Sequence, residues 1–166
     1  IPQQDMPVLE PLERAHLMDE VAIGYTNEQA IVEAQRCLQC KNQPCVNGCP
    51  VNVPIPQFIA EIANGDFKKA VDIIKTTNLL PAICGRVCPQ EKQCQEQCTV
   101  GKALKDVEKS VAIGRLERFV ADYERENNLQ TLPEIAPATG KKVAIIGSGP
   151  AGLTAAADVR RDGHEV

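Results

Sequence analysis

Apolar residues recur at helical spacing through most of the first 130 residues. The sequence TNEQ at residues 26–29 predicts a helix start, because a hydroxyl at the N-cap and a Gln three residues later form a capping box. This helix is expected to extend through Leu38. Two shorter helices are predicted around residues 57–63 and 66–76, and an Asn-Gly sequence is expected to end the first of them.

The longest predicted helix covers about residues 110–126. Its apolar residues recur every three or four positions and form one stripe, made of Ile113, Leu116, Val120 and Tyr123. Glu117 lies at the edge of this stripe, whereas Arg115 and Arg118 are expected to point outward. A carboxylate on an apolar face needs a partner. Glu117 is therefore expected to be paired or to bind a metal; the alternative is a glutamate at the edge of the surface.

The pattern changes near residue 130. TLPEIAPATGKK reads as a linker, because it holds two prolines and a glycine. KVAIIGSGPAGLTAAADVRRDGHEV then predicts a strand, a tight turn, a helix and the start of a second strand. The predicted parts are an N-terminal arm, a helical domain, a linker and the opening of an α/β domain, at residues 1–25, 26–130, 131–141 and 142–166. We expect the chain to be a fragment, or the ordered part, of a larger protein.

Composition and charge exclude some classes of function. With 22 acidic and 18 basic residues the net charge is −4, which does not suit a nucleic-acid-binding surface. No apolar run approaches the roughly 20 residues of a membrane span, and the N-terminus has no signal-peptide apolar region. A cytoplasmic protein is expected. Hydrophobic residues make up 43% of the chain but aromatic residues only 3%, so the core should be aliphatic.

The chain has eight cysteines, which require an explanation. Disulfide frameworks belong mainly to small secreted domains, and the sequence shows no sign of secretion. In a reducing compartment, thiolates are free to bind zinc or iron. The cysteine count therefore favours a metal site over disulfides.

The spacing of the cysteines distinguishes a predicted iron–sulfur site from a zinc site. The two runs are Cys37-x2-Cys40-x4-Cys45-x3-Cys49-Pro and Cys84-x3-Cys88-Pro-x5-Cys94-x3-Cys98. Each run has a Cys-Pro pair, as in bacterial ferredoxins, where the cysteine before proline often serves the other cluster. Zinc sites usually pair two Cys-x2–4-Cys knuckles across a longer gap, and these spacings fit that arrangement poorly. The sequence predicts two four-iron clusters with interlocked halves.

A G-x-G-x-x-G motif follows the predicted strand and opens an alanine-rich helix, which is the context of a dinucleotide-binding turn. The pyrophosphate would lie at the helix N-terminus, where free N–H groups favour anions. The candidate cofactor-binding residues are Gly147, Ser148, Gly149, Pro150, Ala151 and Gly152. The motif does not separate FAD from NAD, and a glycine turn in an unrelated α/β domain is the alternative.

Taken together, CLQCKNQPCVNGCP, ICGRVCPQEKQCQEQC, VAIGRLERFVADYE and KVAIIGSGPAGL resemble the N-terminal part of the glutamate synthase small-subunit family. The resemblance covers about residues 22–166. Within the family, it is strongest to the large subunit of the electron-bifurcating NADH-dependent ferredoxin:NADP oxidoreductase. It implies an α-helical ferredoxin-like domain with two 4Fe-4S clusters, followed by the first βα unit of a Rossmann-like domain that binds FAD. NAD(P)H would bind outside this chain.

The resemblance also implies two ligand sets. One cluster would take Cys37, Cys40, Cys45 and Cys98, and the other would take Cys49, Cys88 and Cys94. In dihydropyrimidine dehydrogenase, a related protein, a Gln side chain completes the second set, and the matching position here is Glu117. Cys84 is the competing fourth ligand.

The expected function is electron transfer between NAD(P)H, FAD and two clusters, toward a partner subunit or a ferredoxin in a hetero-oligomer. Within the same class of enzyme, the alternative is the small subunit of glutamate synthase. An alternative from another class is a cluster-bearing docking module without turnover of its own. The chain alone is expected to be inactive, since its nucleotide site is incomplete.

Overall fold

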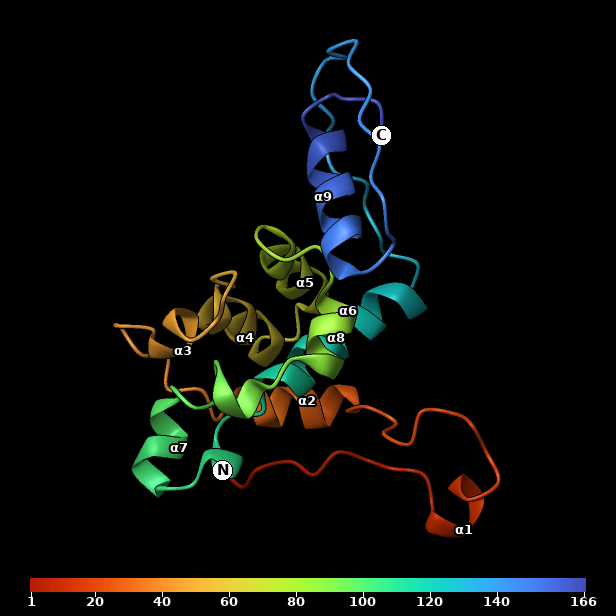
Figure 1. Ribbon diagram of the computed structural model, residues 1–166. Helices are drawn as coiled ribbons and strands as arrows, with labels where there is room; N and C mark the ends of the chain where they lie inside the picture. The colour runs from red at the N-terminus through yellow and green to blue at the C-terminus, as the bar shows by residue number, and fades with distance from the viewer. The chain divides into compact units, whose positions relative to one another are not determined.

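The computed structural model describes residues 1–166, which divide into two units, residues 1–129 and 130–166 (Figure 1). The chain contains no β-strand, only isolated bridges. The first unit consists of α1 (Pro11–Arg14), α2 (Asn27–Ala34), α3 (Pro44–Asn47), α4 (Ile55–Ala63), α5 (Phe67–Lys75), α6 (Pro81–Val87), η1 (Gln90–Lys92), α7 (Thr99–Leu104), η2 (Val107–Lys109) and α8 (Ile113–Glu126). The prediction of an α-helical domain is thereby confirmed. No helix is both long enough and apolar enough to cross a membrane.

Helix α2 begins with the predicted capping box. The Thr26 hydroxyl accepts from the Gln29 N–H at 3.2 Å, and the Gln29 side chain accepts from the Thr26 N–H at 3.0 Å. The helix ends at Ala34, however, and Leu38 is 62% exposed, so the expected extension through Leu38 is wrong. The chain tightens into a turn after Ala34, and Gln39 then adopts a left-handed conformation with φ of 48°.

Replacing Thr26 with alanine is expected to destabilise the first unit by about 1 kcal/mol, because the first turn of α2 loses its side-chain acceptor. The melting temperature should fall by a few degrees, at about 2–4 °C for each kcal/mol in a chain of this size. Thermal unfolding followed by circular dichroism measures this effect. Thr77→Ala, at another exposed threonine, is the matched control. An equal shift in the two variants would contradict the capping contribution.

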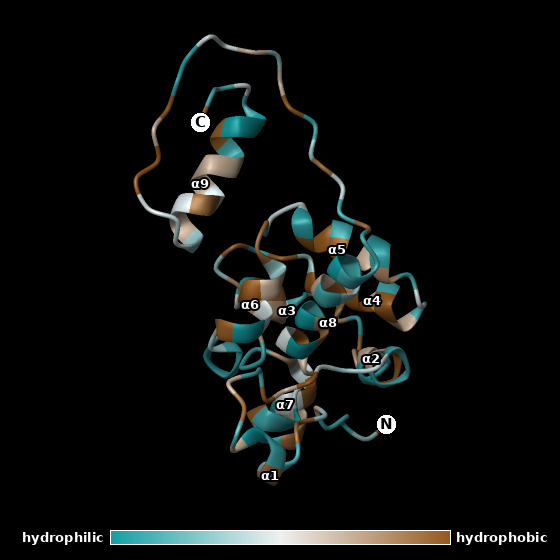
Figure 2. Ribbon diagram, turned by 90° about the vertical axis from the view of Figure 1, so that its right-hand side faces the viewer, coloured by the Kyte–Doolittle hydropathy of each residue, from teal (hydrophilic) through white to brown (hydrophobic).

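The core of the first unit lies where α4, α5 and α8 meet. Its fully buried side chains are almost all aliphatic or phenylalanine, and the largest include Phe58, Ile59, Ile62, Ile74, Leu116 and Val120. Along α8, Ile113, Leu116 and Val120 are buried and Tyr123 packs against the core, which confirms the predicted stripe. In Figure 2 the ribbon of α5 is brown on one side and teal on the other, as expected for a helix with one buried face.

Helix α6 packs against α8 through a glycine. A Cβ atom on Gly85 would lie 2.6 Å from the backbone nitrogen of Arg118, a separation that real Cβ atoms do not show. The absence of a side chain at Gly85 therefore permits the two helices to approach closely. This approach places Cys84 of α6, and Cys88 directly after the helix, near Glu117 in the middle of α8.

Arg118 does not point outward as the stripe predicted. Its side chain is 7% exposed, donates to the Ala22 carbonyl at 2.6 Å and forms ion pairs with Asp122 and Glu20, both at 3.3 Å. The N-terminal arm explains the difference. It doubles back through α1, with Val8 bridged to Ala22, and residues 20–22 cover this side of α8 (Figure 1). The sequence pattern of α8 alone could not predict that Arg118 is buried, because the segment that buries it lies about a hundred residues earlier in the chain.

The second unit contains α9 (Pro150–Arg161), which begins directly after Gly149. One parallel bridge joins Lys142 to Glu165, but neither segment forms a strand. The predicted helix is confirmed. The predicted strands are wrong, because the two short parallel segments make only a single bridge, a marginal pairing. The Rossmann-like βα unit is not shown and stays a prediction.

Candidate metal centre

Four cysteines line one cavity of the first unit. Cys37 and Cys40 come from the loop after α2, Cys45 from α3 and Cys98 from the residue that precedes α7. The cavity has a volume of about 350 Å³. Its other walls are mostly apolar, from Leu38, Pro44, Ile55, Pro56, Ile59, Val100, Val111 and Ile113, with Thr99 as the polar exception. The cavity is therefore lined by four thiols in mostly apolar surroundings.

Two left-handed residues shape the loop that carries the first three thiols. Gln39 has φ of 48° and Gln43 has φ of 42°. Residues other than glycine seldom adopt such angles, so each marks a sharp change of chain direction. Pro44 then starts α3, which suits its fixed φ angle. These turns bring Cys37, Cys40 and Cys45 onto one cavity within nine residues of sequence.

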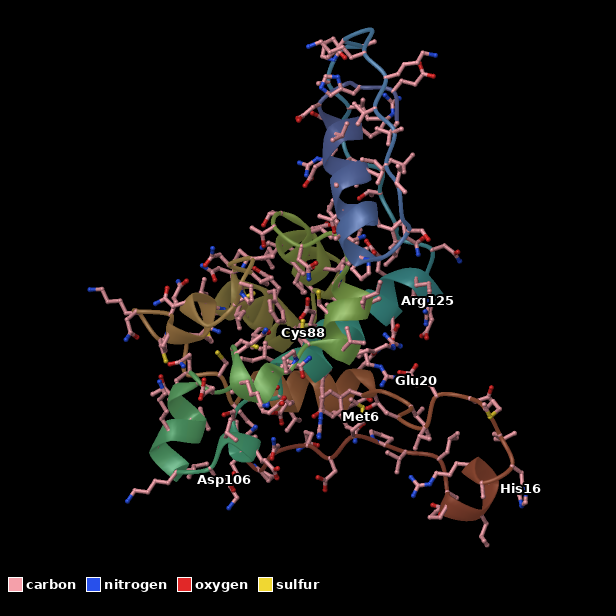
Figure 3. All side chains as sticks on the ribbon, in the orientation of Figure 1. Met6, His16, Glu20, Cys88, Asp106 and Arg125 are labelled. Carbon is pink, nitrogen blue, oxygen red and sulfur yellow. The ribbon has the colours of Figure 1, made fainter.

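A second cavity, of about 580 Å³, is lined by the other candidate ligands. These are Cys49, Cys84, Cys88, Cys94 and Glu117. Asn78, Gln90 and Gln93 add polar side chains to its wall. Cys88, labelled in Figure 3, is half-buried and lies among the ribbons of several helices of the first unit. The structure thus brings every metal-site residue predicted from the sequence to one of two cavities. Each cysteine run contributes one residue to the cavity of the other run: Cys98 lines the first cavity and Cys49 lines the second.

The donor set fits iron–sulfur clusters. All eight cysteines are free and none forms a disulfide. No group of three or more His, Cys, Asp or Glu side chains is arranged to hold a single metal ion, and the thiols line the walls of two cavities. A structural zinc site needs four donors around one ion, whereas a four-iron cluster takes one thiolate at each iron corner.

Burial raises the pKa of five of these thiols, those of Cys37, Cys45, Cys84, Cys88 and Cys94. The pKa of Cys45 rises to about 11, and the pKa values of Cys88 and Cys94 rise to about 12; burial is the largest cause and neighbouring thiolates add to it. Negative charges gathered in an apolar cavity repel one another and lose hydration. Such thiols release their protons readily only when a positive charge, such as a metal, is bound.

Glu117 is a buried carboxylate without a cationic partner. The residue is only 8% exposed, so the surface-edge alternative is wrong. Its Oε1 atom accepts a hydrogen bond from Asn78 Nδ2 at 2.7 Å. Burial raises the pKa of the carboxyl group to about 7, and the bond from Asn78 opposes that rise. The Arg118 side chain next along α8 pairs with other carboxylates, so no basic side chain neutralises Glu117.

Some polar residues of the two cavities were not predicted. The Cys40 thiol donates to the Thr99 hydroxyl at 3.2 Å, and Gln39 Nε2 donates to the Cys37 sulfur at 3.4 Å. Asn78 and Gln90 line the second cavity. Gln39 and Thr99 stand next to cysteines in the sequence, which is a usable signal. Asn78 stands six residues before Cys84, and nothing local marks it.

A buried ion pair at the end of α2, between Glu33 and Arg36, is connected by hydrogen bonds to the segments that carry the cysteines. Glu33 accepts hydrogen bonds from Arg36 at 2.5 Å, from the Ala112 N–H at 2.9 Å and from the Gln4 N–H at 2.8 Å. Arg36 also donates to the carbonyls of Ser110 and Lys109. The Ser110 hydroxyl in turn donates to the Gln95 carbonyl at 2.9 Å. Gln95 lies between Cys94 and Cys98, so this chain of bonds holds one cysteine of each cavity.

The glycine motif lies in the second unit. Gly147 has a left-handed φ of 110°, which a residue with a side chain would rarely adopt. A Cβ atom on Gly152 would meet the Gly147 carbonyl oxygen at 2.1 Å. Both positions therefore require glycine for a tight turn into α9. Ser148, Gly149, Pro150 and Ala151 complete this turn and the first residues of the helix.

The helical fold and the two thiol-lined cavities define an iron–sulfur protein, and comparison with known proteins identifies its family. Residues 14–129 match the family described as dihydropyrimidine dehydrogenase domain II, 4Fe-4S cluster. The chain belongs to this family, and its relatives confirm the predicted resemblance to the glutamate synthase small-subunit family.

Three curated relatives illustrate the range of the family. The NAD-dependent dihydropyrimidine dehydrogenase subunit PreT of Escherichia coli K12 is 41% identical over 149 residues, which cover 90% of this chain and 35% of PreT. The NADPH glutamate synthase small chain of the same organism is 40% identical, over 87% of this chain and 30% of its own length. The small chain from Azospirillum brasilense is 33% identical, over 98% of this chain and 33% of its own length. The chain spans about a third of the length of these relatives.

Proposed function

We propose that this chain is the electron-transfer part of an NAD(P)H-dependent iron–sulfur flavoprotein oxidoreductase. The observation that carries the proposal is the pair of cavities in one helical unit, lined by eight free thiols and one buried carboxylate. When bound, two four-iron clusters and FAD would supply the redox chemistry and carry electrons from NAD(P)H toward a partner subunit or a ferredoxin.

The ligand sets follow the two cavities. Cys37, Cys40, Cys45 and Cys98 would hold one cluster, since they are the thiols of the first cavity. In the second cavity, Cys49, Cys88, Cys94 and Glu117 would hold the other, with Cys84 as a nearby thiol that does not bind iron. Glu117 is favoured over Cys84 because it is a buried carboxylate with no cation beside it. Iron would provide the missing positive charge.

The remaining residues of the cavities would set the environment of the clusters. Ile55 and Ile113 contribute apolar walls to both cavities and would keep water from the space between them. The Gln39 amide donates to the Cys37 sulfur, and such hydrogen bonds to a thiolate tune the potential of its cluster. A carboxylate ligand in the second set would make the two potentials differ.

The second unit would begin a Rossmann-like βα unit that binds FAD. The tight turn at Gly147 and the start of α9 directly after Gly149 support this proposal. Free N–H groups at the beginning of α9 would face the pyrophosphate. The proposed segment is residues 142–166, and NAD(P)H would bind outside the chain.

The partner would be a second oxidoreductase subunit in a cytoplasmic hetero-oligomer. Two of the relatives carry names of enzyme parts, a dehydrogenase subunit and a synthase small chain. The role of glutamate synthase small subunit is a specific version of the same proposal. The contrasting function is a cluster-bearing docking module. Reduction of an artificial dye by NAD(P)H, measured on the full-length protein without its partner, separates the two, because a docking module would give no turnover.

Metal analysis tests the central proposal directly. Anaerobically purified protein is expected to contain about eight iron and about eight acid-labile sulfide per chain, as two four-iron clusters require. Zinc should be far below one equivalent. Stoichiometric zinc without acid-labile sulfide would rule out the proposed function. Iron and sulfide near four per chain would mean that only one of the two cavities holds a cluster.

A further inference from the structure

Asn78 links the two competing side chains of the second cavity. It lies in the segment between α5 and α6, is only 7% exposed and lines the cavity itself. Its Nδ2 atom donates to Glu117 Oε1 at 2.7 Å. Its Oδ1 atom accepts from the Leu80 N–H at 3.0 Å and from the Cys84 thiol at 3.6 Å. A single amide therefore contacts both candidates for the fourth ligand of one cluster.

The orientation of this amide is determined by the backbone. The Leu80 N–H precedes α6 and can only donate, so the atom facing it must be the oxygen. The Nδ2 group must then face Glu117, whose carboxylate can only accept when it is ionised. Turning the amide over would break both bonds and place two oxygen atoms together. Asn78 is thus a donor toward Glu117 and an acceptor toward Cys84.

These two roles affect the candidate ligands in opposite ways. The bond to Oε1 orients the carboxylate of Glu117 and leaves Oε2 for the cavity. The sulfur of Cys84, in contrast, lies 3.6 Å from the Oδ1 atom of the same amide, and an oxygen atom offers no hydrogen to a sulfur that would bind metal. The same amide therefore presents a donor to Glu117 and an oxygen to Cys84, which favours Glu117 as the ligand.

We infer that Asn78 is a positioning residue that directs Glu117 to the second cluster and keeps Cys84 from replacing it. The inference deepens the proposed function and rests on it. It adds to the proposed ligand set, because it states that Asn78 determines whether Glu117 or Cys84 binds the cluster. When the donor toward Glu117 is lost, Cys84 is the thiol placed to take the vacant corner, with its proton passing to solvent.

Asn78→Asp is the discriminating variant, because it preserves the shape and the oxygen that faces Leu80 but replaces the donor toward Glu117 with an acceptor. The anaerobically purified protein is measured for iron and sulfide content, and the reduced clusters by electron paramagnetic resonance. The expected result for Asn78→Asp is a changed signal from the second cluster and an unchanged signal from the first. Cys84→Ala alone should keep the parental iron and both signals. Adding Cys84→Ala to Asn78→Asp should lower the iron by about half.

Loss of about half of the iron in Asn78→Asp itself would also support the inference, because Glu117 would then need Asn78 in order to bind. Two parental signals in Asn78→Asp, or full iron in the double variant, would overturn it. Half the iron lost in Cys84→Ala alone would overturn it as well, because Cys84 would then be the ligand. Asn64→Asp, at an exposed asparagine, is the matched control.

A second variant is used if circular dichroism shows that Asn78→Asp does not fold. Asn78→Ser adds no charge but shortens the side chain, so it cannot reach both Leu80 and Glu117. Its test uses the same electron paramagnetic resonance signals and the same iron analysis, for Asn78→Ser alone and for the double variant with Cys84→Ala. Failure of the proposed function gives a different result, since zinc without sulfide would then already appear in the parent protein.

Discussion

Replacing Glu117 with alanine is expected to remove about half of the iron and sulfide from the purified protein. Glu117 is 8% exposed, lines the second cavity together with four thiols and has Asn78 as its hydrogen-bond partner. Without the carboxylate, one corner of the proposed second cluster would lose its ligand, whereas the four thiols of the first cavity are untouched. The iron content should therefore fall from about eight to about four per chain, counting four iron for each cluster.

Three further variants make this result specific. Cys84→Ser should keep about eight iron, because Cys84 is not a ligand in the proposed set. Glu117→Gln should retain the second cluster, because its amide oxygen can still occupy the same corner, but should shift its potential, because the ligand loses its negative charge. Glu126→Ala removes an exposed glutamate from the same helix and should change nothing. Iron lost in Cys84→Ser and retained in Glu117→Ala would instead mean two clusters held by cysteine alone.

Replacing Glu33 with alanine is expected to destabilise the first unit by about 3–5 kcal/mol, the range for breaking a buried ion pair from one side. The Glu33 side chain is fully buried and that of Arg36 is 6% exposed. The substitution leaves the guanidinium of Arg36 without its carboxylate and the N–H groups of Ala112 and Gln4 without their acceptor. The melting temperature, followed by circular dichroism, should fall by about 10 °C, given about 2–4 °C for each kcal/mol.

Glu28→Ala is the control for this prediction, because Glu28 is exposed on the same helix. It loses only a favourable charge near the helix N-terminus, which is worth less than about 1 kcal/mol. The double variant Glu33→Leu with Arg36→Met should recover part of the lost stability, since an apolar pair leaves no unpaired charge. A melting temperature for Glu33→Ala within about 2 °C of the parent would contradict the structural role of the pair.

Several features could be predicted from the sequence because they depend on residues close together in the chain. The capping box at Thr26 forms as predicted because it needs only residues three positions apart. The apolar stripe of α8 and the helix that follows Gly149 also formed, since both depend on periodicity or on a short turn. Cysteine spacing indicated iron–sulfur chemistry, and the match to a 4Fe-4S domain family agrees with it.

The division of the cysteines between two sites could not be read from spacing alone. It was implied by the resemblance to a family, and the structure places the same two groups on two cavities. Cys98 lies beside Cys37 because α7 and the loop after α2 come together in space, a contact across about 60 residues. The ligand sets themselves remain predictions that iron analysis of the variants will test.

The sequence by itself determined what kind of chemistry this chain could support and where its main helices begin, because thiol spacing, capping residues and apolar periodicity act over a few residues. The tertiary structure alone decided that Glu117 and Arg118 are buried and that Asn78 joins Glu117 to Cys84. Those outcomes depend on α6 approaching α8 at Gly85 and on the arm covering α8 at Ala22. The physical reason is that burial is set by which distant segments pack together, and no local pattern records it.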